Sequence, residues 1–469
     1  MAEEEVTFDT GDVAFQIICT GLVWIMTPGL AYFYSGMARS KSALSLIMVC
    51  FIAIAVVSIQ WWMFGFSLTF SGSSKNGFIG DFQYAFGRHM NGPKDALPFV
   101  PTLPISVFAC FQMTFAIITA GLIFGGPAER MRVLPTIVFI FIWTTIVYDP
   151  IAFWSWSENG WLRKLGSLDF AGGTPVHIAS GAAGLAYSIV LGKRQGLGKE
   201  KFKPHNLSNV FLGTALLWFG WFGFNAGSAL GSNARAGMAL LTTNLSTAVG
   251  GITWVLIDYH REKKLSALGF CSGAVAGLVG ITPGAGFVSP CPAAAIGLIT
   301  ATVCNFGIKI KDKIGFDDAL DVFGVHCVGG ITGNILTGIF AQKFIQNLDG
   351  ALSYKEQGGW LDGSWNQILF QLVGCVAGFF WSFCLTFVIL KIMDAIPGLR
   401  IRVERDAEVF GVDQSEMGEV AYDYVSYSQA DLMNMASAVN MNNNLPVESV
   451  EQLPIEQIVT EKDISSKKV

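Results

Sequence analysis

Long apolar stretches separated by short polar loops run through most of this chain. A helix needs about 20 apolar residues to cross a bilayer, and eleven stretches reach that length. They cover residues 13–35, 43–71, 102–126, 133–156, 170–192, 208–230, 236–258, 267–286, 289–308, 319–341 and 365–393. The pattern predicts an all-α integral membrane protein with eleven transmembrane helices.

Charge divides the chain into three parts. Residues 1–12 contain five acidic residues and no basic ones, and residues 400–469 have a net charge of −7. The whole chain has a net charge of −5, so residues 13–399 carry +7. We expect an N-terminal tail over residues 1–12, a transmembrane domain over residues 13–393 and a polar C-terminal tail over residues 394–469. The basic residues form short clusters between apolar runs, which argues against nucleic acid as a partner.

The distribution of Lys and Arg predicts the orientation. One alternate set of loops contains fifteen of these residues and the other set eight. Loops rich in Lys and Arg face the cytoplasm, so we expect an extracellular N-terminus and a cytoplasmic C-terminus. The acidic start lacks the basic segment of a signal peptide. The outer loops contain tryptophans typical of an interfacial belt, namely Trp156, Trp161, Trp360 and Trp365.

Only two histidines lie inside the apolar runs, and their surroundings match. Five positions around each share the spacing D-x6-V-H-x3-G-x2-G. They are Asp169, Val176, His177, Gly181 and Gly184 in the first copy, and Asp318, Val325, His326, Gly330 and Gly333 in the second. Five helices separate the copies, so the second enters the membrane from the opposite side. This indicates a five-plus-five inverted repeat with a site near the midplane.

The repeat places the two imidazoles at similar depth. Each histidine follows its aspartate by about eight residues, or roughly 12 Å of helix, so the rings can meet inside a core of ~30 Å. An ionisable residue inside a membrane is costly and indicates function, and paired imidazoles can share a proton. The alternative is a histidine bonded only to a neighbouring helix. For Asp169 and Asp318 we expect capping of a helix N-terminus, with Pro175 placing a helix start near Thr174.

Metal and disulfide chemistry find no support in the sequence. The nine cysteines form no CxxC pair and lie mostly in apolar runs, where Cys acts as a small buried hydrophobe. The remaining histidines, His89, His205 and His260, lie in loops without partners at metal-ligand spacing. We therefore expect no metal and no cofactor.

Five longer motifs resemble the ammonium transporter family, the Amt/Mep/Rh proteins, and most of all its fungal Mep members. They are GGPAER at 125–130, LDFAGGTPVH at 168–177, KPHNLSNVFLGTALLWFGWFGFNAGSA at 203–229, CSGAVAGLVGITPGAGF at 271–287 and DVFGVHCVGGITGNILTGIFA at 321–341. The resemblance covers roughly residues 13–425. It implies a plasma-membrane homotrimer with one hydrophobic pore per subunit, which takes up ammonium or methylammonium from outside.

The resemblance also implies roles for individual positions. They are a substrate-binding site of Trp156, Ser228, Asp169 and Phe115, a gate of Phe115, Phe224 and Phe111, and a pore lining of His177, His326 and Trp221. The residue types suit these roles. A cation gains attraction over a Trp face, a Ser hydroxyl accepts an N–H bond, and stacked Phe rings exclude hydrated cations, whose desolvation is costly.

The chain differs from the family at one notable position. Asp149 stands in the outer-facing stretch VYDPIAFWSW where the family has an uncharged residue. It either adds negative potential to the outer vestibule or lies against lipid headgroups. Some fungal members replace the first pore histidine by Glu, whereas both are His here, which favours the more selective type.

Two alternative classes of function remain open. The stretch FGVDQSEMGEVAY at 410–422 resembles the family's cytoplasmic C-terminal motif, which docks under the pore and couples subunits. An ammonium sensor would signal nitrogen status through this tail, with a kinase or a cytoplasmic regulator as its partner. A membrane-embedded enzyme is the other class, and no residue constellation favours it.

Overall fold

The computed structural model describes residues 8–90, 92, 95–200, 202–350 and 357–422. Residues 1–7 of the expected N-terminal tail and 423–469 of the C-terminal tail lie outside the described residues. Within the described ranges all regular secondary structure is helical, apart from isolated bridges such as Met131 with Arg402. The all-α prediction is confirmed.

The spans match the predicted runs. Ten helical segments are long and apolar enough to cross a membrane, and Ala267–Ile281 is an eleventh, shorter apolar helix. The ten are Thr10–Met37, Ser40–Phe70, Ile105–Gly125, Leu134–Leu165, Gly173–Leu191, Leu207–Gly227, Ala234–Glu262, Pro290–Ile314, Phe323–Phe340 and Gln367–Ala395. The protein is therefore a multi-pass membrane protein.

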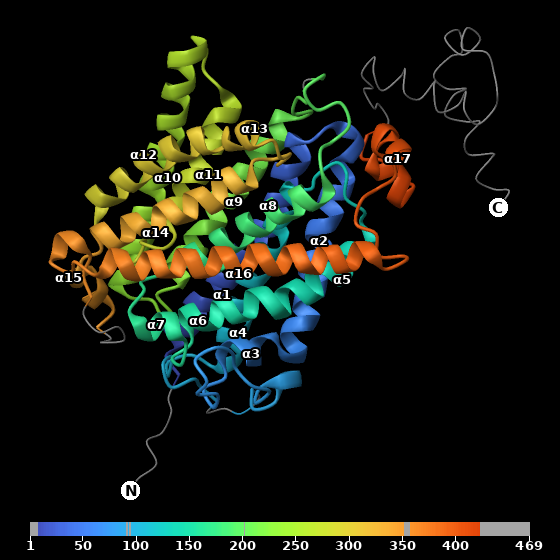
Figure 1. The fold of residues 1–469 in the computed structure, drawn as a ribbon. Coiled ribbons are helices and arrows are strands. Elements are labelled where there is room, and N and C mark those ends of the chain that lie inside the picture. Colours follow the sequence, from blue (N-terminus) through green and yellow to red (C-terminus); the bar gives the residue numbers. More distant parts are fainter. Residues whose placement is uncertain (1–7, 91, 93–94, 201, 351–356, 423–469) are drawn as a thin grey trace, which may run out of the picture.

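Several spans consist of more than one element, which Figure 1 labels in chain order. The α-helices are α1 (Thr10–Met37), α2 (Ala43–Gln60), α3 (Phe66–Phe70), α4 (Ile105–Leu122), α5 (Leu134–Trp143), α6 (Asp149–Trp156), α7 (Trp161–Leu165), α8 (Ala179–Leu191), α9 (Leu207–Gly227), α10 (Ala234–Glu262), α11 (Ala267–Ile281), α12 (Pro290–Gly307), α13 (Ile310–Ile314), α14 (Val328–Phe340), α15 (Lys343–Gln346), α16 (Gln367–Ala395) and α17 (Arg405–Phe410).

Four spans contain a π-helical turn, a feature frequent at functional sites. These turns are Trp61–Gly65, Thr144–Tyr148, Gly173–Ile178 and Phe323–Cys327. The last two contain His177 and His326, and each continues into an α-helix of 13 residues. The two copies of the sequence repeat therefore have the same local structure.

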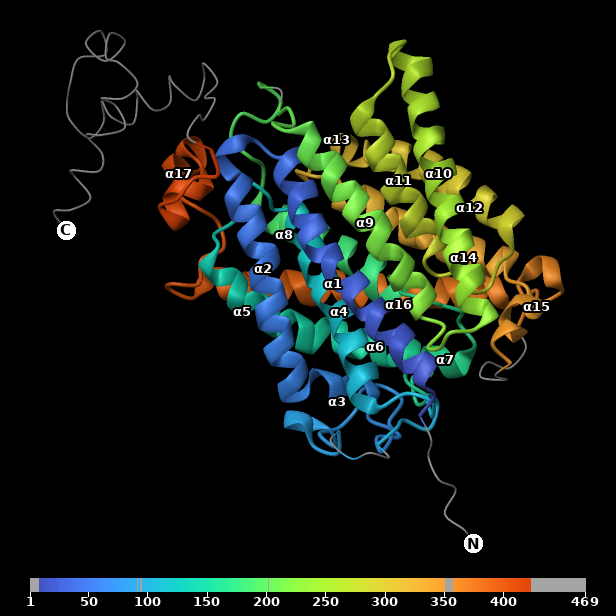
Figure 2. The same ribbon diagram turned by 180° about the vertical axis from the view of Figure 1, so that it is seen from behind.

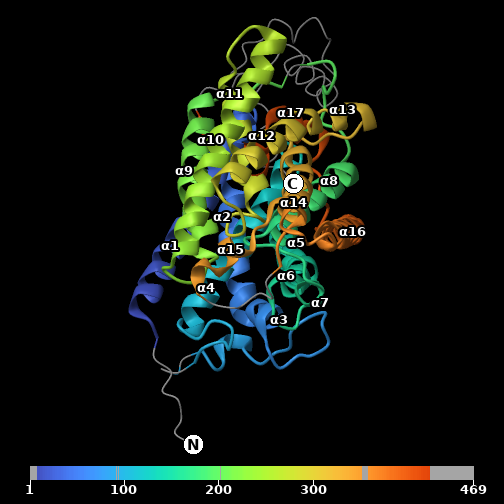
Figure 3. The ribbon, with the colours of Figure 1, turned by 90° about the vertical axis from the view of Figure 1, so that its left-hand side faces the viewer.

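The helices form one bundle with α1 along α9, and α10 against α11 and α12. The long helix α16 crosses the outside of the bundle against α8 and α14 (Figure 1). Helix α1 begins at one end of the bundle, and α17 lies at the other, called the α17 end below (Figures 2 and 3). An odd number of spans requires this separation.

Small residues allow the two repeat copies to pack closely against each other while they run in opposite directions. A Cβ on Gly181 would meet the backbone of Cys327, and a Cβ on Gly330 would meet His177. Residue numbers fall along one segment as they rise along the other, so the segments run antiparallel. This geometry confirms the predicted inversion of the repeat.

Candidate functional site

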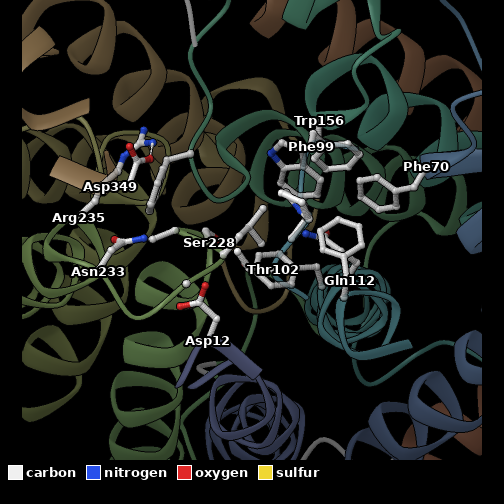
Figure 4. A pocket seen from close by; sticks show the side chains of 18 of the residues that line it. Asp12, Phe70, Phe99, Thr102, Gln112, Trp156, Ser228, Asn233, Arg235 and Asp349 are labelled. Atoms are coloured by element: carbon white, nitrogen blue, oxygen red, sulfur yellow. Dashed lines mark hydrogen bonds and ion pairs between the residues drawn. The ribbon is translucent and has the colours of Figure 1, made fainter. Parts of the chain in front are cut away.

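An open pocket of about 260 Å³ is shown in Figure 4. Asp12 in the first turn of α1 belongs to its lining, so the pocket lies at the end opposite α17. Its lining includes Phe115, Trp156 and Ser228. The Trp156 Nε1–H donates to the backbone oxygen of Asp169 at 3.1 Å, and the ring meets Phe115 edge-on at 5.8 Å. The Ser228 hydroxyl donates to the Phe224 carbonyl at 2.9 Å, so its lone pairs are available to a donor in the pocket.

Trp156 is only 8% exposed, so the interfacial position expected for it is wrong. Trp360 and Trp365 remain exposed and contact each other at 5.6 Å.

The pocket also contains polar groups that sequence reasoning missed. The Gln112 Oε1 atom is buried and has no hydrogen-bond partner within the described part of the chain. Arg235 pairs with Asp349 at 2.8 Å on another side of the same pocket (Figure 4). The sequence does contain a signal for Gln112, namely a Gln one turn before Phe115 in an apolar span. It contains none for the ion pair, because Arg235 and Asp349 are 114 residues apart.

Two stacked rings separate this pocket from the next cavity. Phe115 comes from α4 and Phe224 from α9, and their centroids are 4.0 Å apart at an interplanar angle of 23°. Phe115 lines the outer pocket, and Phe224 lines a middle cavity of about 20 Å³. Phe111 contacts Phe115 edge-on at 4.9 Å and lines neither space. The partition therefore consists of two rings, with the third packed beside it.

The two histidines meet beyond the rings. The Nδ1 atoms of His177 and His326 are 3.3 Å apart, and the imidazoles are nearly parallel at 27°. Both rings line the middle cavity, and His326 also lines an inner cavity of about 20 Å³. The contact joins residues 149 positions apart, as the repeat predicted.

Trp221 and Thr282 fix the outer edge of the histidine pair. The indole of Trp221 stacks on His177 at 5.4 Å and 21°, and its Nε1–H donates to the Thr282 hydroxyl at 2.9 Å. The same hydroxyl lies 3.3 Å from His177 Nε2 and donates to the Leu278 carbonyl at 2.7 Å. Thr282 was not identified from the sequence, because a Thr in a Gly-rich stretch gives no distinctive signal.

The two aspartates of the repeat cap the π turns that carry the histidines. Asp169 accepts the backbone N–H groups of Gly172, Gly173 and Thr174, each at 2.7 Å. Asp318 accepts those of Val322 at 3.1 Å and Phe323 at 2.7 Å. The capping role predicted for both is confirmed. Asp169 does not line the outer pocket.

A charged network closes the α17 end of the bundle. Glu129 receives Arg39 and Arg194 at 3.0 Å each, and Arg194 also pairs with Asp317 at 2.9 Å. The two guanidinium groups each lie 4.4 Å from the Phe202 ring. Burial alone would raise the pKa of Glu129, but the two arginines outweigh it and lower this pKa to about 2. Glu129 is therefore ionised at neutral pH.

The C-terminal segment docks on the same end. Asp413 accepts the backbone N–H groups of Leu44 at 2.8 Å and Ser45 at 2.7 Å, which caps the start of α2. The Lys41 ammonium donates to the Val409 carbonyl at 2.8 Å. Glu416 pairs with Arg132 at 3.2 Å in a more exposed position.

Asp149 lies in neither of the two places expected for it. Its side chain is fully buried and does not line the outer pocket, so both the vestibule and the headgroup interpretations are wrong. Its Oδ2 atom accepts a bond from Gln60 Nε2 at 2.7 Å, and the same amide lies 3.2 Å from Thr145 Oγ1. The residue joins α6 to α2 beside two π turns.

Three spaces arranged in series through a bundle of membrane-length helices define a membrane channel or transporter. The chain belongs to the Ammonium Transporter Family, whose model matches residues 14–422.

Known proteins are similar to this chain along nearly its whole length. Ammonium transporter 1 of Schizosaccharomyces pombe is 48% identical over 421 residues, which are 89% of this chain and 83% of that protein. The crystal structure of Saccharomyces cerevisiae Mep2 matches with a TM-score of 0.81 at 42% identity, covering 90% of this chain and 94% of the other. Candida albicans Mep2 matches with the same TM-score at 44% identity, over 89% and 94% of the two chains. The chain is therefore similar to fungal ammonium transporters of the Mep type over most of its length.

Proposed function

We propose that ammonium enters at the outer pocket, passes the Phe115–Phe224 partition and crosses the histidine pair in each subunit. The observation that carries this proposal is the series of spaces itself. Phe115 lines the first, Phe224 and His177 line the second, and His326 lines the second and third.

The outer pocket has the groups that recruit a small cation. The Trp156 face offers cation–π attraction, which strengthens when the ion loses water. The Ser228 hydroxyl accepts one N–H bond. Asp169 acts indirectly, since its carboxylate is used in the cap and its backbone oxygen holds the indole of Trp156.

The middle of the path favours a neutral species. The Phe rings and the small cavity between Met26, Leu30 and Trp221 offer few polar ligands, so a bare cation pays a large desolvation penalty there. Loss of a proton before this point removes that penalty and leaves ammonia to cross. Potassium carries no proton to lose and is excluded.

Orientation and assembly complete the proposal. The α17 end faces the cytoplasm, because the loops there carry most of the Lys and Arg. The N-terminus is extracellular and transport runs inward across the plasma membrane. The lipid-embedded protein works as a homotrimer, with methylammonium as a second substrate, and it is not an enzyme.

A sensor function is the second candidate. The docked segment that includes Glu408, Asp413 and Glu416 connects the tail to the transport domain, and a kinase or regulator acting on Ser415 would reach it there. Truncation after residue 425 separates the roles. Loss of signalling with uptake intact would favour the sensor.

Transport by the purified protein in liposomes tests the main proposal. Ammonium and methylammonium are expected to enter, while potassium is excluded, with the charge carried per substrate read from the current. Equal permeation of ammonium and potassium would contradict the proposed path.

A further inference from the structure

The Thr282 hydroxyl meets three partners, and their chemistry restricts where the protons lie. The Trp221 indole has an N–H and no acceptor, so it can only donate. The Leu278 carbonyl can only accept. His177 Nε2 can do either, depending on the tautomer of the ring.

The distances favour one arrangement of the three bonds. The separation of 2.7 Å from Thr282 Oγ1 to the Leu278 oxygen is the usual length for an O–H···O bond, whereas His177 Nε2 is 3.3 Å away. The single hydroxyl proton therefore goes to Leu278. Both lone pairs then accept, one from Trp221 and one from His177 Nε2–H.

This arrangement determines the second histidine as well. A neutral His177 with its proton on Nε2 has a bare Nδ1, which can only accept. The 3.3 Å contact between the Nδ1 atoms then requires the proton on His326 Nδ1. His326 Nε2 is left as the unprotonated nitrogen of the pair.

We propose that Thr282 is a positioning residue that sets the tautomers of both pore histidines, with His177 protonated on Nε2 and His326 on Nδ1. This inference rests on the proposed passage of substrate past the pair. The order has a direction. Starting from the opposite order, His177 Nε2 takes up a proton, the His177 Nδ1 proton moves to His326 Nδ1, and His326 Nε2 releases its proton, which leaves the pair in the order described above. One proton enters and one leaves. Another inward passage requires the opposite order, in which the hydroxyl turns from Leu278 to His177 Nε2.

Nitrogen-15 solid-state NMR of the protein in lipid bilayers tests the assignment directly. The chain has five histidines, so single His177→Gln and His326→Gln variants identify the two pore signals. The expected wild-type spectrum has a protonated Nε2 on His177 and a protonated Nδ1 on His326. The reverse pattern would overturn the proposal, and the wild-type spectrum decides this even if a variant fails to fold.

Substitution tests the role of the hydroxyl. Thr282→Val has a similar shape without the donor and acceptor, so we expect the tautomer ratio to move by about tenfold, the effect of one hydrogen bond. Thr282→Ser keeps the hydroxyl and should restore the wild-type ratio. Thr247→Val is the matched control, because within the described part of the chain its hydroxyl donates only to the Thr243 carbonyl of its own helix, α10. An unchanged ratio in Thr282→Val would contradict the proposal.

Uptake provides a separate readout. Ammonium uptake by Thr282→Val should fall and its solvent deuterium isotope effect should change, while Thr282→Ser behaves like wild type. A protein that moved no ammonium would fail this assay and still show the predicted spectrum, so the failure of the proposed function is distinguishable from failure of this inference.

Discussion

Asp169 and Asp318 cap the two π turns that hold His177 and His326, from positions 149 residues apart. Each carboxylate takes up backbone N–H groups that a helix start leaves without partners. The outcome is that each histidine is held by a rigid turn on its own half of the bundle. The distance between the rings is therefore set by how the halves pack.

Loss of either imidazole should change both flux and selectivity. His177→Ala or His326→Ala removes one of the two imidazoles that line the middle cavity and contact each other there. Ammonium and potassium fluxes in liposomes measure the effect, and His260→Ala, on an exposed turn of α10, is the control. If the double variant transported ammonium and excluded potassium as well as wild type, the proposed pore would be wrong.

Removing one ring of the partition should open it. Phe224→Ala deletes the partner that stacks on Phe115 at 4.0 Å, so hydrated cations lose a barrier and potassium permeation is expected to rise. Phe219→Ala changes a Phe on the same helix that is 56% exposed, and it should leave potassium excluded. A Phe224→Ala protein that elutes as wild type in size-exclusion chromatography yet stays closed to potassium speaks against a gate.

Asp149→Asn should leave the concentration dependence of uptake unchanged. The residue is absent from the lining of all three spaces, and Asn keeps an oxygen for Gln60. Asp149→Leu removes that acceptor and should reduce stability by about 1–3 kcal/mol, measured by thermal unfolding in detergent. A large change in the ammonium concentration that gives half-maximal uptake in Asp149→Asn would restore the vestibule interpretation.

Glu129 should make stability depend on acid pH. Its pKa is lowered in the folded state to about 2. The stabilisation that ionised Glu129 gives the folded protein is therefore fully present above the pKa of an unperturbed Glu, about 4.3. The contribution is lost as pH falls toward 2. Thermal unfolding of wild type and Glu129→Gln should differ most near pH 7 and converge at the acid end. A constant difference across this range contradicts the assignment.

Asp413 should hold the C-terminal segment more strongly than Glu416 does. Asp413 is fully buried and caps α2, whereas Glu416 pairs with the partly exposed Arg132. Loss of a cap costs about 1 kcal/mol, and exposed ion pairs contribute less. Hydrogen exchange of the Leu44 and Ser45 amides should rise more in Asp413→Ala than in Glu416→Ala. The opposite order would place the main anchor elsewhere.

The sequence predicted the helices well because apolar length is a one-dimensional signal, and the histidine pair because its motif occurs twice. It did not predict the burial of Asp149, since one acidic residue between Tyr148 and Pro150 gives no information on which helix it faces. The role of Thr282 was also missed. Leu278 lies one turn before it in α11, but Trp221 and His177 come from other helices, and only packing brings these two to the hydroxyl.

The glycines of the repeat have a consequence for how this protein can change over time. Gly181 lies against the backbone of Cys327 in the other half, and Gly330 lies against the turn of His177. A larger side chain at either position meets main chain of the opposite half and has to displace it. The two copies of a duplicated segment can usually diverge independently. Here the backbone of each copy restricts which residues the other copy can carry at its contact positions.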